Sequence, residues 1–134
     1  MKLFDEYYKS GCNKFNTKYY KELKKNCHKY FYLLYRRQPK GVGGIFYDYL
    51  NNGNWDQDFG STKEAGIQFK KAFVKGIKNN ITKKWTRQEN SAHLDKRGKY
   101  TEFNLLYDRG KRFDPMTNGN IEAILMLMPP TVAW

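Results

Sequence analysis

A single carboxylate in the first half of the chain has neighbours that favour chemistry. Asp48 lies two positions after Phe46 and two positions before Leu50, in a segment rich in aromatic residues. If residues 43–50 form a strand, these three side chains share one face, because side chains alternate across a strand. Burying an unpaired charge is costly, so the carboxylate needs either an arginine of the fold or a donor on a ligand. A desolvated carboxylate is a candidate general base, and a structural ion pair is the alternative.

Cations gather immediately before this segment. Arg36, Arg37 and Lys40 precede a Gly-Val-Gly-Gly run at residues 41–44. The run does not match the dinucleotide-binding fingerprint, because it comes before a candidate strand and does not open a helix. Glycines at the start of a strand more often mark a bulge or a close backbone approach. Arginine binds carboxylate and phosphate groups bidentately, so the segment predicts an anion site, with a solvated basic loop as the alternative.

Polar side chains alternate with apolar ones in a second candidate strand over residues 99–107. Glu102 and Asn104 fall on one face, and Phe103 and Leu105 fall on the other. The functional interpretation is that the two polar residues line a cleft. The alternative is an ordinary strand with one face in the core and the other in solvent.

Helical periodicity marks two segments that would support these strands. Residues 17–33 are amphipathic, with lysines between the apolar positions. A second helix is predicted to start near Ser61, which has capping-box spacing to Glu64. A short helical turn is predicted at residues 85–89. The buried stripe of the second helix is predicted at i, i+4 and i+8, at Phe69, Phe73 and Ile77.

The order of elements defines the expected fold class. Strands are predicted at residues 43–50, 99–107 and 121–128, with turn residues between the last two. Helix, strand, helix, strand, strand is typical of an α+β fold with a partly antiparallel sheet, and it excludes a doubly wound sheet. The chain stops at Trp134 soon after the last strand, which leaves that strand uncovered. The pattern therefore predicts an incomplete fold.

Composition limits the functional classes. A chain of 134 residues fits one domain. Its hydrophobic fraction of 40% and mean hydropathy of −0.89 exclude an integral membrane protein, and its aromatic fraction of 17% argues against disorder. The 25 basic and 13 acidic residues give a net charge of +12. Such a balance predicts an anionic partner, which could be nucleic acid, a membrane surface or a small molecule with several acidic groups.

Cysteine and histidine usage indicates neither a disulfide scaffold nor a metal site. Cys12 and Cys27 lack the spacing of a zinc motif and suit a reducing compartment. His28 and His93 lie far apart in the sequence without clustered carboxylates, and we expect both at the surface. There is neither a signal peptide nor a stretch apolar enough to span a membrane, so a cytoplasmic protein is expected.

Three segments in collinear order resemble the motifs of oxygen-dependent coproporphyrinogen III oxidases. They are residues 30–48 (YFYLLYRRQPKGVGGIFYD), 97–110 (RGKYTEFNLLYDRG) and 119–130 (GNIEAILMLMPP). The resemblance covers only the C-terminal half of the family. It therefore implies that residues 1–134 are a single C-terminal portion of the domain, a fragment whose N-terminal half is absent.

The resemblance carries expectations about fold and reaction. Members decarboxylate two propionates of coproporphyrinogen III to vinyl groups, which yields protoporphyrinogen IX, with dioxygen as co-substrate. The four carboxylates of the substrate would explain the positive charge. No organic cofactor is implied, and a divalent metal is contested within the family. Members form homodimers and contain a large, flat antiparallel sheet flanked by helices.

The resemblance also assigns roles to individual positions. Asp48 matches the first acidic position after Gly-Gly-Ile-Phe, and Tyr49 replaces a second acidic residue common in the family. Arg36 matches the arginine ahead of the glycines, so the resemblance implies catalytic roles for Asp48 and Arg36. Tyr35 stands where some bacterial members have a metal-binding histidine, so no metal ligand is expected there.

The remaining implied contacts are with the substrate. Backbone amides at Gly43 and Gly44 would bind carboxylates beside the cations. Asn118, Gly119 and Asn120 match a substrate-contacting turn. Many members have an arginine at the position of Asn120, so one carboxylate contact is expected to be lost here.

Two other functions remain open from the sequence. The first is a catalytically dead remnant that dimerises through the family interface. The second is a basic nucleic-acid-binding domain whose aromatic residues stack on bases. The chain lacks an RNA-binding signature, and its aromatic residues fall at predicted core positions, so neither a nucleic acid partner nor a membrane span is expected.

Overall fold

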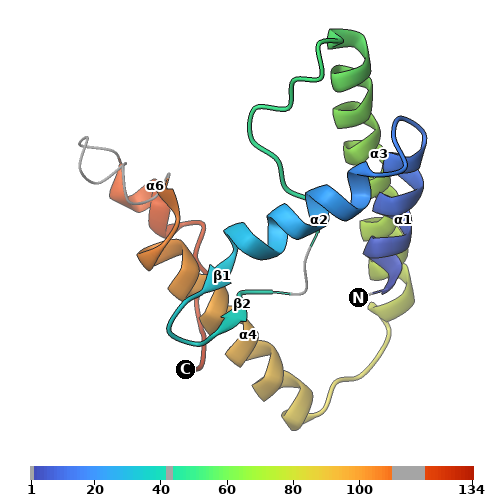
Figure 1. Cartoon of the computed structure of the whole chain (residues 1–134). Coiled ribbons are helices and arrows are strands. Elements are labelled where there is room, and N and C mark those ends of the chain that lie inside the picture. Colours follow the sequence, from blue (N-terminus) through green and yellow to red (C-terminus); the bar gives the residue numbers. More distant parts are fainter. Residues whose placement is uncertain (1, 42–43, 110–119) are drawn as a thin grey trace. The chain divides into compact units, whose positions relative to one another are not determined.

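The computed structural model describes residues 2–41, 44–109 and 120–134 (Figure 1). These residues form two compact units. The first unit consists of Met1–Tyr30 and Val42–Lys83, and the second consists of Phe31–Gly41 and Lys84–Trp134. The expected single portion over residues 1–134 stays a prediction.

Three helices build the first unit. They are α1 (Lys2–Asn13), α2 (Tyr19–Tyr30) and α3 (Trp55–Asn80). Helix α1 packs along α3 and also contacts α2 (Figure 1). The helix predicted over residues 17–33 is confirmed, although it ends at Tyr30. Helix α1 was not predicted from the sequence.

Helix α3 begins earlier than the sequence predicts. Its N-cap is Asn54, whose side-chain oxygen accepts a hydrogen bond from the backbone N–H of Gln57 at 3.0 Å. Asparagine is among the best N-cap residues, so the helix starts at Asn54 and not at the predicted Ser61. Ser61 consequently lies inside the helix, where its hydroxyl donates to the carbonyl of Asp58 at 2.9 Å.

The face of α3 that lies against α1 is formed by small and polar residues. Ala72 and Gln68 are buried. A Cβ atom at Gly11 of α1 would lie 2.8 Å from Cγ of Gln68, so only glycine allows this close approach. The predicted buried stripe is wrong, because its three members are 43–50% exposed. These three residues are Phe69, Phe73 and Ile77.

The strand predicted over residues 43–50 is also wrong where the structure describes it. Residues 44–50 have no strand structure and instead follow α2, with the N–H of Phe46 donating to the carbonyl of Leu23 at 3.1 Å. Ile45 and Tyr47 pack against a buried cluster around Leu23. A strand needs a neighbour to satisfy its backbone groups, and here a carbonyl within α2 accepts from one of them.

The second unit combines a short hairpin with two helices. Strands β1 (Tyr32–Leu33) and β2 (Gln38–Pro39) pair in antiparallel register, Tyr32 with Pro39 and Leu33 with Gln38. Helix α4 (Arg87–Leu106) contacts β1, and α6 (Ile121–Leu125) follows it. Leu33 and Phe103 are the largest fully buried side chains, so the core of this unit lies between the hairpin and α4.

A capping box starts α4. The Thr86 hydroxyl accepts from the N–H of Glu89 at 3.2 Å, and the Glu89 carboxylate accepts from the N–H of Thr86 at 2.8 Å. The predicted helical turn at residues 85–89 is therefore the first turn of a long helix. Further along α4, a Cβ at Gly98 would lie 2.0 Å from the Ala133 carbonyl oxygen, so glycine lets the C-terminal segment pack closely.

The strand predictions at residues 99–107 and 121–128 are wrong, because these stretches contain the end of α4 and all of α6. The described residues are mostly helical with one two-stranded antiparallel sheet, and they retain an α+β class. The implied large sheet is not present among them. No helix of the described residues is long and apolar enough to cross a membrane.

Candidate functional site

The strongest polar contact of the second unit involves a predicted site residue. Arg36 lies in the turn between β1 and β2, and its Nε donates to Oε2 of Glu102 on α4 at 2.5 Å. The Glu102 side chain is 10% exposed, whereas that of Arg36 is 32% exposed. A guanidinium group has five N–H donors, so this ion pair leaves Arg36 with further donors. Arg36 can therefore anchor the hairpin and still bind a second carboxylate.

Lys40 sits among three aromatic rings. Its Nζ lies 4.0 Å from the ring centroid of Phe31, 4.3 Å from that of Phe103 and 5.0 Å from that of Tyr100. A cation within about 6 Å of a ring centroid is attracted by the negative face of the ring. The N–H of Lys40 also donates to the carbonyl of Phe31 at 2.8 Å. The hairpin end is thus held at α4 by a cation.

A third cation extends this arrangement along α4. The guanidinium carbon of Arg97 lies 4.6 Å from the ring centroid of Tyr100. Arg97 and His93 also line a cavity of about 620 Å³, whose other walls are apolar residues of α4 and of the segment 126–131. We call Arg36, Lys40, Arg97 and the three rings around Lys40 the cation–aromatic cluster.

This cluster has the chemistry to bind a flat ligand that carries several carboxylates. Cations bind carboxylates, arginine most strongly when two N–H groups donate. Aromatic faces offer apolar contact to a ring system. The carboxylate of Glu102 lies beside the cluster and is already paired with Arg36. The cluster can bind and orient an anion but offers no evident general base.

Asp48 is placed differently from the sequence expectation. Its side chain is exposed, whereas Phe46 and Leu50 are half-buried. The prediction of a desolvated carboxylate is wrong, since the expected strand does not form and the three residues do not share a strand face. Asp48 belongs to the first unit and Arg36 to the second. A joint catalytic role for the two stays a prediction.

Some of the other predicted substrate-binding residues lie within the described residues, and others lie outside them. Gly43, Asn118 and Gly119 lie outside the described residues. Gly44 is described, and a Cβ there would meet nothing within 4 Å. The side-chain oxygen of Asn120 accepts from the N–H groups of the second and third residues that follow it, at 3.0 and 3.3 Å. This residue therefore caps α6.

Tyr35, at the position of the family histidine, is 87% exposed. Its ring centroid lies 6.5 Å from that of Tyr107 on α4. In the part of the chain that the structure describes, no group of three histidine, cysteine or acidic side chains lies close enough to hold a metal. Burial raises the pKa of the Cys12 thiol, which disfavours the thiolate form that binds metals.

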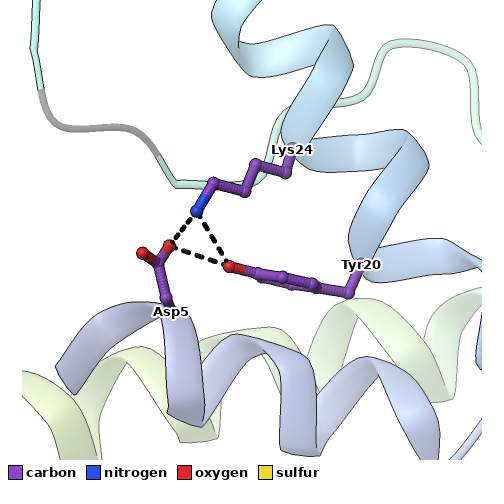
Figure 2. Close-up of polar contacts among 3 residues, drawn as sticks. All are labelled: Asp5, Tyr20 and Lys24. Atoms are coloured by element: carbon purple, nitrogen blue, oxygen red, sulfur yellow. Dashed lines mark hydrogen bonds and ion pairs between the residues drawn. The ribbon is translucent and has the colours of Figure 1, made fainter. Parts of the chain in front are cut away.

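A second polar cluster lies in the first unit (Figure 2). Asp5 of α1 accepts from the Tyr20 hydroxyl at 2.8 Å and from Lys24 Nζ at 2.7 Å, and Lys24 also donates to the Tyr20 oxygen at 3.1 Å. Burial alone would raise the pKa of Asp5, but the hydrogen bonds from Lys24 and Tyr20 outweigh it and lower that pKa.

The protonation states of this cluster favour a structural role. The hydrogen bond to Asp5 raises the pKa of Lys24 despite burial. Burial is the main cause that raises the pKa of Tyr20. Both groups therefore keep their protons and are poor nucleophiles or bases near neutral pH. The cluster ties α2 to α1, and the candidate site remains the cation–aromatic cluster.

Sequence reasoning found only part of that cluster. Arg36 and Lys40 were recognised as cations ahead of the glycines. Tyr100 and Phe103 are not predicted as partners of Lys40, because the alternation of residues 99–107 predicts a strand. Arg97 and Phe31 enter the sequence analysis only as parts of motifs. The spacing of Arg97, Tyr100 and Phe103 at three-residue steps places them near one another on a helix, and it was the available signal.

Comparison with known proteins agrees with the motifs in both units. The family described as Coproporphyrinogen III oxidase matches residues 1–134. The chain is 48% identical over 131 residues to the oxygen-dependent coproporphyrinogen-III oxidase of Rickettsia bellii strain OSU 85-389, which covers 98% of this chain and 47% of that relative. Relatives of the same name from Rickettsia africae and Rickettsia akari are 48% and 47% identical, with the same coverage.

The chain spans about half the length of the curated relatives it matches. Within that span the family match is complete, because it includes all 134 residues. An identity near one half over nearly the whole chain points to the same family. The chain belongs to the coproporphyrinogen III oxidase family.

Proposed function

We propose that this chain serves in haem biosynthesis as part of an oxygen-dependent coproporphyrinogen III oxidase. The reaction removes two propionate carboxylates as carbon dioxide and leaves two vinyl groups, while dioxygen accepts the electrons and is reduced. The observation that carries the proposal is the family match over residues 1–134, supported by 48% identity to a named oxidase. The proposal includes a cytoplasmic location, a homodimeric assembly and no organic cofactor.

The cation–aromatic cluster would bind the substrate. Arg36, Lys40 and Arg97 offer positive charge on one side of α4, and the substrate carries four carboxylates. The faces of Phe31 and Tyr100 would contact the pyrrole rings. The cluster would thereby fix which propionates reach the reacting position, since a bound geometry lowers the entropic part of the barrier.

Asp48 would act as the acid or base of the reaction. A carboxylate can accept a hydrogen bond from a pyrrole N–H and can take a proton as the ring is activated. Its exposure in the first unit leaves it accessible to a ligand. Tyr35 stands where the resemblance places a metal-binding histidine in some bacterial members, and no step of this proposal uses a metal.

The proposal includes the large sheet that the family resemblance implies. Residues 99–107 alternate in polarity with a period of two, which is unusual for a helix. The buried polar atoms Thr101 Oγ1 and Asn104 Nδ2 near the end of α4, and Tyr107 Oη at its C-cap, have no hydrogen-bond partner. Each such group costs about 1–3 kcal/mol. Polar groups of the rest of the family domain would relieve this cost, and amide exchange of residues 99–107 in the assembled enzyme tests whether the segment keeps its helical hydrogen bonds there.

A catalytically dead remnant that dimerises is the second candidate. It is favoured by Asn120, which caps α6 and stands where many members have a substrate-binding arginine. Lack of product in the presence of the missing family portion would favour this candidate.

The test of the proposed function supplies the part of the domain that this chain does not match. The part of the Rickettsia bellii oxidase without a counterpart in this chain is purified as a separate polypeptide and mixed with the full chain. Protoporphyrinogen IX formed from coproporphyrinogen III is measured in air and under nitrogen. Product that depends on both polypeptides and on dioxygen supports the proposal, whereas no product under any condition contradicts it.

A further inference from the structure

Helix α3 buries small and polar side chains and leaves several large apolar side chains exposed. Trp55, Phe59, Phe69, Phe73 and Ile77 lie within about a quarter of the helix circumference at 3.6 residues per turn. Their exposed fractions range from 43% to 77%. We call these five residues the α3 stripe. It extends over about 33 Å of the helix at 1.5 Å per residue.

The polar part of the α3–α1 contact does not involve the stripe, although the ring of Phe69 lies near that of Phe4 on α1. Gln68 is buried and donates to Glu64 at 2.6 Å, and Glu64 is paired with Lys14 at 2.5 Å. The buried face is thus a polar contact that the two helices complete between themselves. Phe69 and Phe73, whose spacing in the sequence predicts burial, take no part in this polar contact.

The surface beside the stripe is hollowed and apolar. A cavity of about 510 Å³ lies between Phe73, Ile77 and Ile81 of the α3 side and Phe4 of α1. The rings of Phe69 and Phe4 lie 6.0 Å apart, so the apolar surface continues from α3 onto α1. Grooves of this kind accept apolar side chains of a partner, because burial of apolar area drives association.

Positive charge borders the stripe on one side. Lys70, Lys71, Lys75 and Lys78 line a second cavity of about 670 Å³ together with Ile67 and Val74. Of the three carboxylates of α3, Asp58 accepts two hydrogen bonds from Asn52, Glu64 is paired as described, and Asp56 lies in the first turn, far along the helix from these lysines. The exposed border is therefore strongly basic, and a complementary surface carries carboxylates there.

We propose that the α3 stripe is the docking surface for the remainder of the family domain, which presents an apolar ridge bordered by carboxylates. The inference rests on the proposed function, because it concerns the part of the oxidase that the chain does not span. The relatives are about twice as long as this chain, so a partner of sufficient size belongs to the same enzyme. Covering the stripe removes roughly 400–500 Å² from water, about half of what one partner contributes to a specific interface.

The experiment measures association of the full chain with the unmatched part of the Rickettsia bellii oxidase by titration calorimetry. Phe73→Asn places a polar group at the centre of the stripe. Trp85→Asn is the matched control, since Trp85 is 70% exposed and lies outside α3. Helix content measured by circular dichroism checks that both variants fold. We expect Phe73→Asn to weaken association at least about tenfold and Trp85→Asn to change it less than twofold.

A second set of substitutions tests the basic border of the α3 stripe separately. The double change Lys70→Glu and Lys71→Glu should weaken association, and the wild-type affinity should fall with added salt because salt screens exposed charges. Equal affinity of Phe73→Asn and the wild type overturns the proposal, as does complete absence of association.

Other occupants give distinct results. A stripe-dependent dimer of this chain that the second polypeptide does not displace overturns the proposal in favour of a second copy. Stripe-dependent binding to phosphatidylglycerol vesicles, without polypeptide association, overturns it in favour of a lipid surface. If the mixture is active and Phe73→Asn changes neither its activity nor its affinity, the docking surface is refuted and the proposed function stands. If association depends on the stripe but no product forms, the docking surface stands and the proposed function is refuted.

Discussion

At the residue scale, the candidate site depends on Arg36, whose N–H donors serve both an internal ion pair and, in the proposal, a ligand. Arg36 binds Glu102 through Nε, and Lys40 occupies a cage of aromatic rings near the same end of the hairpin. Arg36 is paired with Glu102 and has further N–H donors, whereas aromatic rings surround the Lys40 ammonium group. The structural role of the Arg36–Glu102 pair and the proposed binding role of the cations predict effects of different substitutions.

The structural role predicts a loss of stability in Glu102→Gln. The change removes the charge that faces Arg36 while it keeps the shape of the side chain. Because Arg36 is partly exposed, the free energy of unfolding should fall by about 1–2 kcal/mol. Urea denaturation measures it, with the exposed Glu122→Gln of the same unit as the control. Equal stability of the two variants would show that the pair does not hold the hairpin.

A different outcome is expected for Asp48. In the chain mixed with the remainder of the domain, Asp48→Asn should lower kcat by about 10²–10⁴-fold with little effect on KM, if the carboxylate acts as acid or base. Because Asp48 is exposed, the free energy of unfolding should change by less than about 0.5 kcal/mol. Asp56→Asn, another exposed carboxylate of the first unit, is the control. An unchanged kcat excludes the catalytic role.

At the element scale, helices were easier to predict than strands. Periodicity located α2 and α3, because an amphipathic helix carries its own backbone hydrogen bonds. Residues 99–107 alternate like a strand, yet the Thr86–Glu89 capping box starts a helix that continues through them. A strand depends on neighbouring strands elsewhere in the fold, and a local sequence pattern does not show whether such neighbours are present. For the same reason Tyr100 and Phe103, the aromatic partners of Lys40 that lie on α4, are not predicted from the sequence.

The α1–α2 contact predicts a specific acid sensitivity. The pKa of Asp5 lies below its ordinary value of 3.8, so the folded chain binds this proton less readily than the unfolded chain. Its stabilising effect is complete above about pH 5 and is lost as the pH falls from there through the lowered pKa of the folded chain. Asp5→Asn should lower stability at pH 7 by about 1 kcal/mol and reduce the loss of stability in acid.

Thermal melts of the Asp5→Asn variant between pH 2.5 and 7 measure this effect. Glu6→Gln, a neighbouring exposed carboxylate on α1, serves as the control. Parallel acid profiles of the wild type and Asp5→Asn would contradict the role assigned to the Asp5–Tyr20–Lys24 cluster.

At the scale of the whole molecule, exposed apolar surface is the dominant property. Trp55, Phe59 and Phe73 are each at least half exposed, and the charge of +12 does not cover them. The purified chain is therefore expected to self-associate in a concentration-dependent way, as large exposed apolar patches do. Sedimentation velocity over a hundredfold concentration range measures this. A monodisperse monomer with a sharp cooperative melt would contradict it.

We propose that this chain acts in the oxidase reaction only together with the rest of the family domain. The rate of protoporphyrinogen IX formation from coproporphyrinogen III in air tests this, measured for the chain alone and for the chain with the unmatched part of the Rickettsia bellii oxidase. We expect a rate at least about 10³-fold lower for the chain alone, because a partial site loses pre-organised binding and electrostatic stabilisation. Equal rates for the chain alone and for the mixture would contradict it.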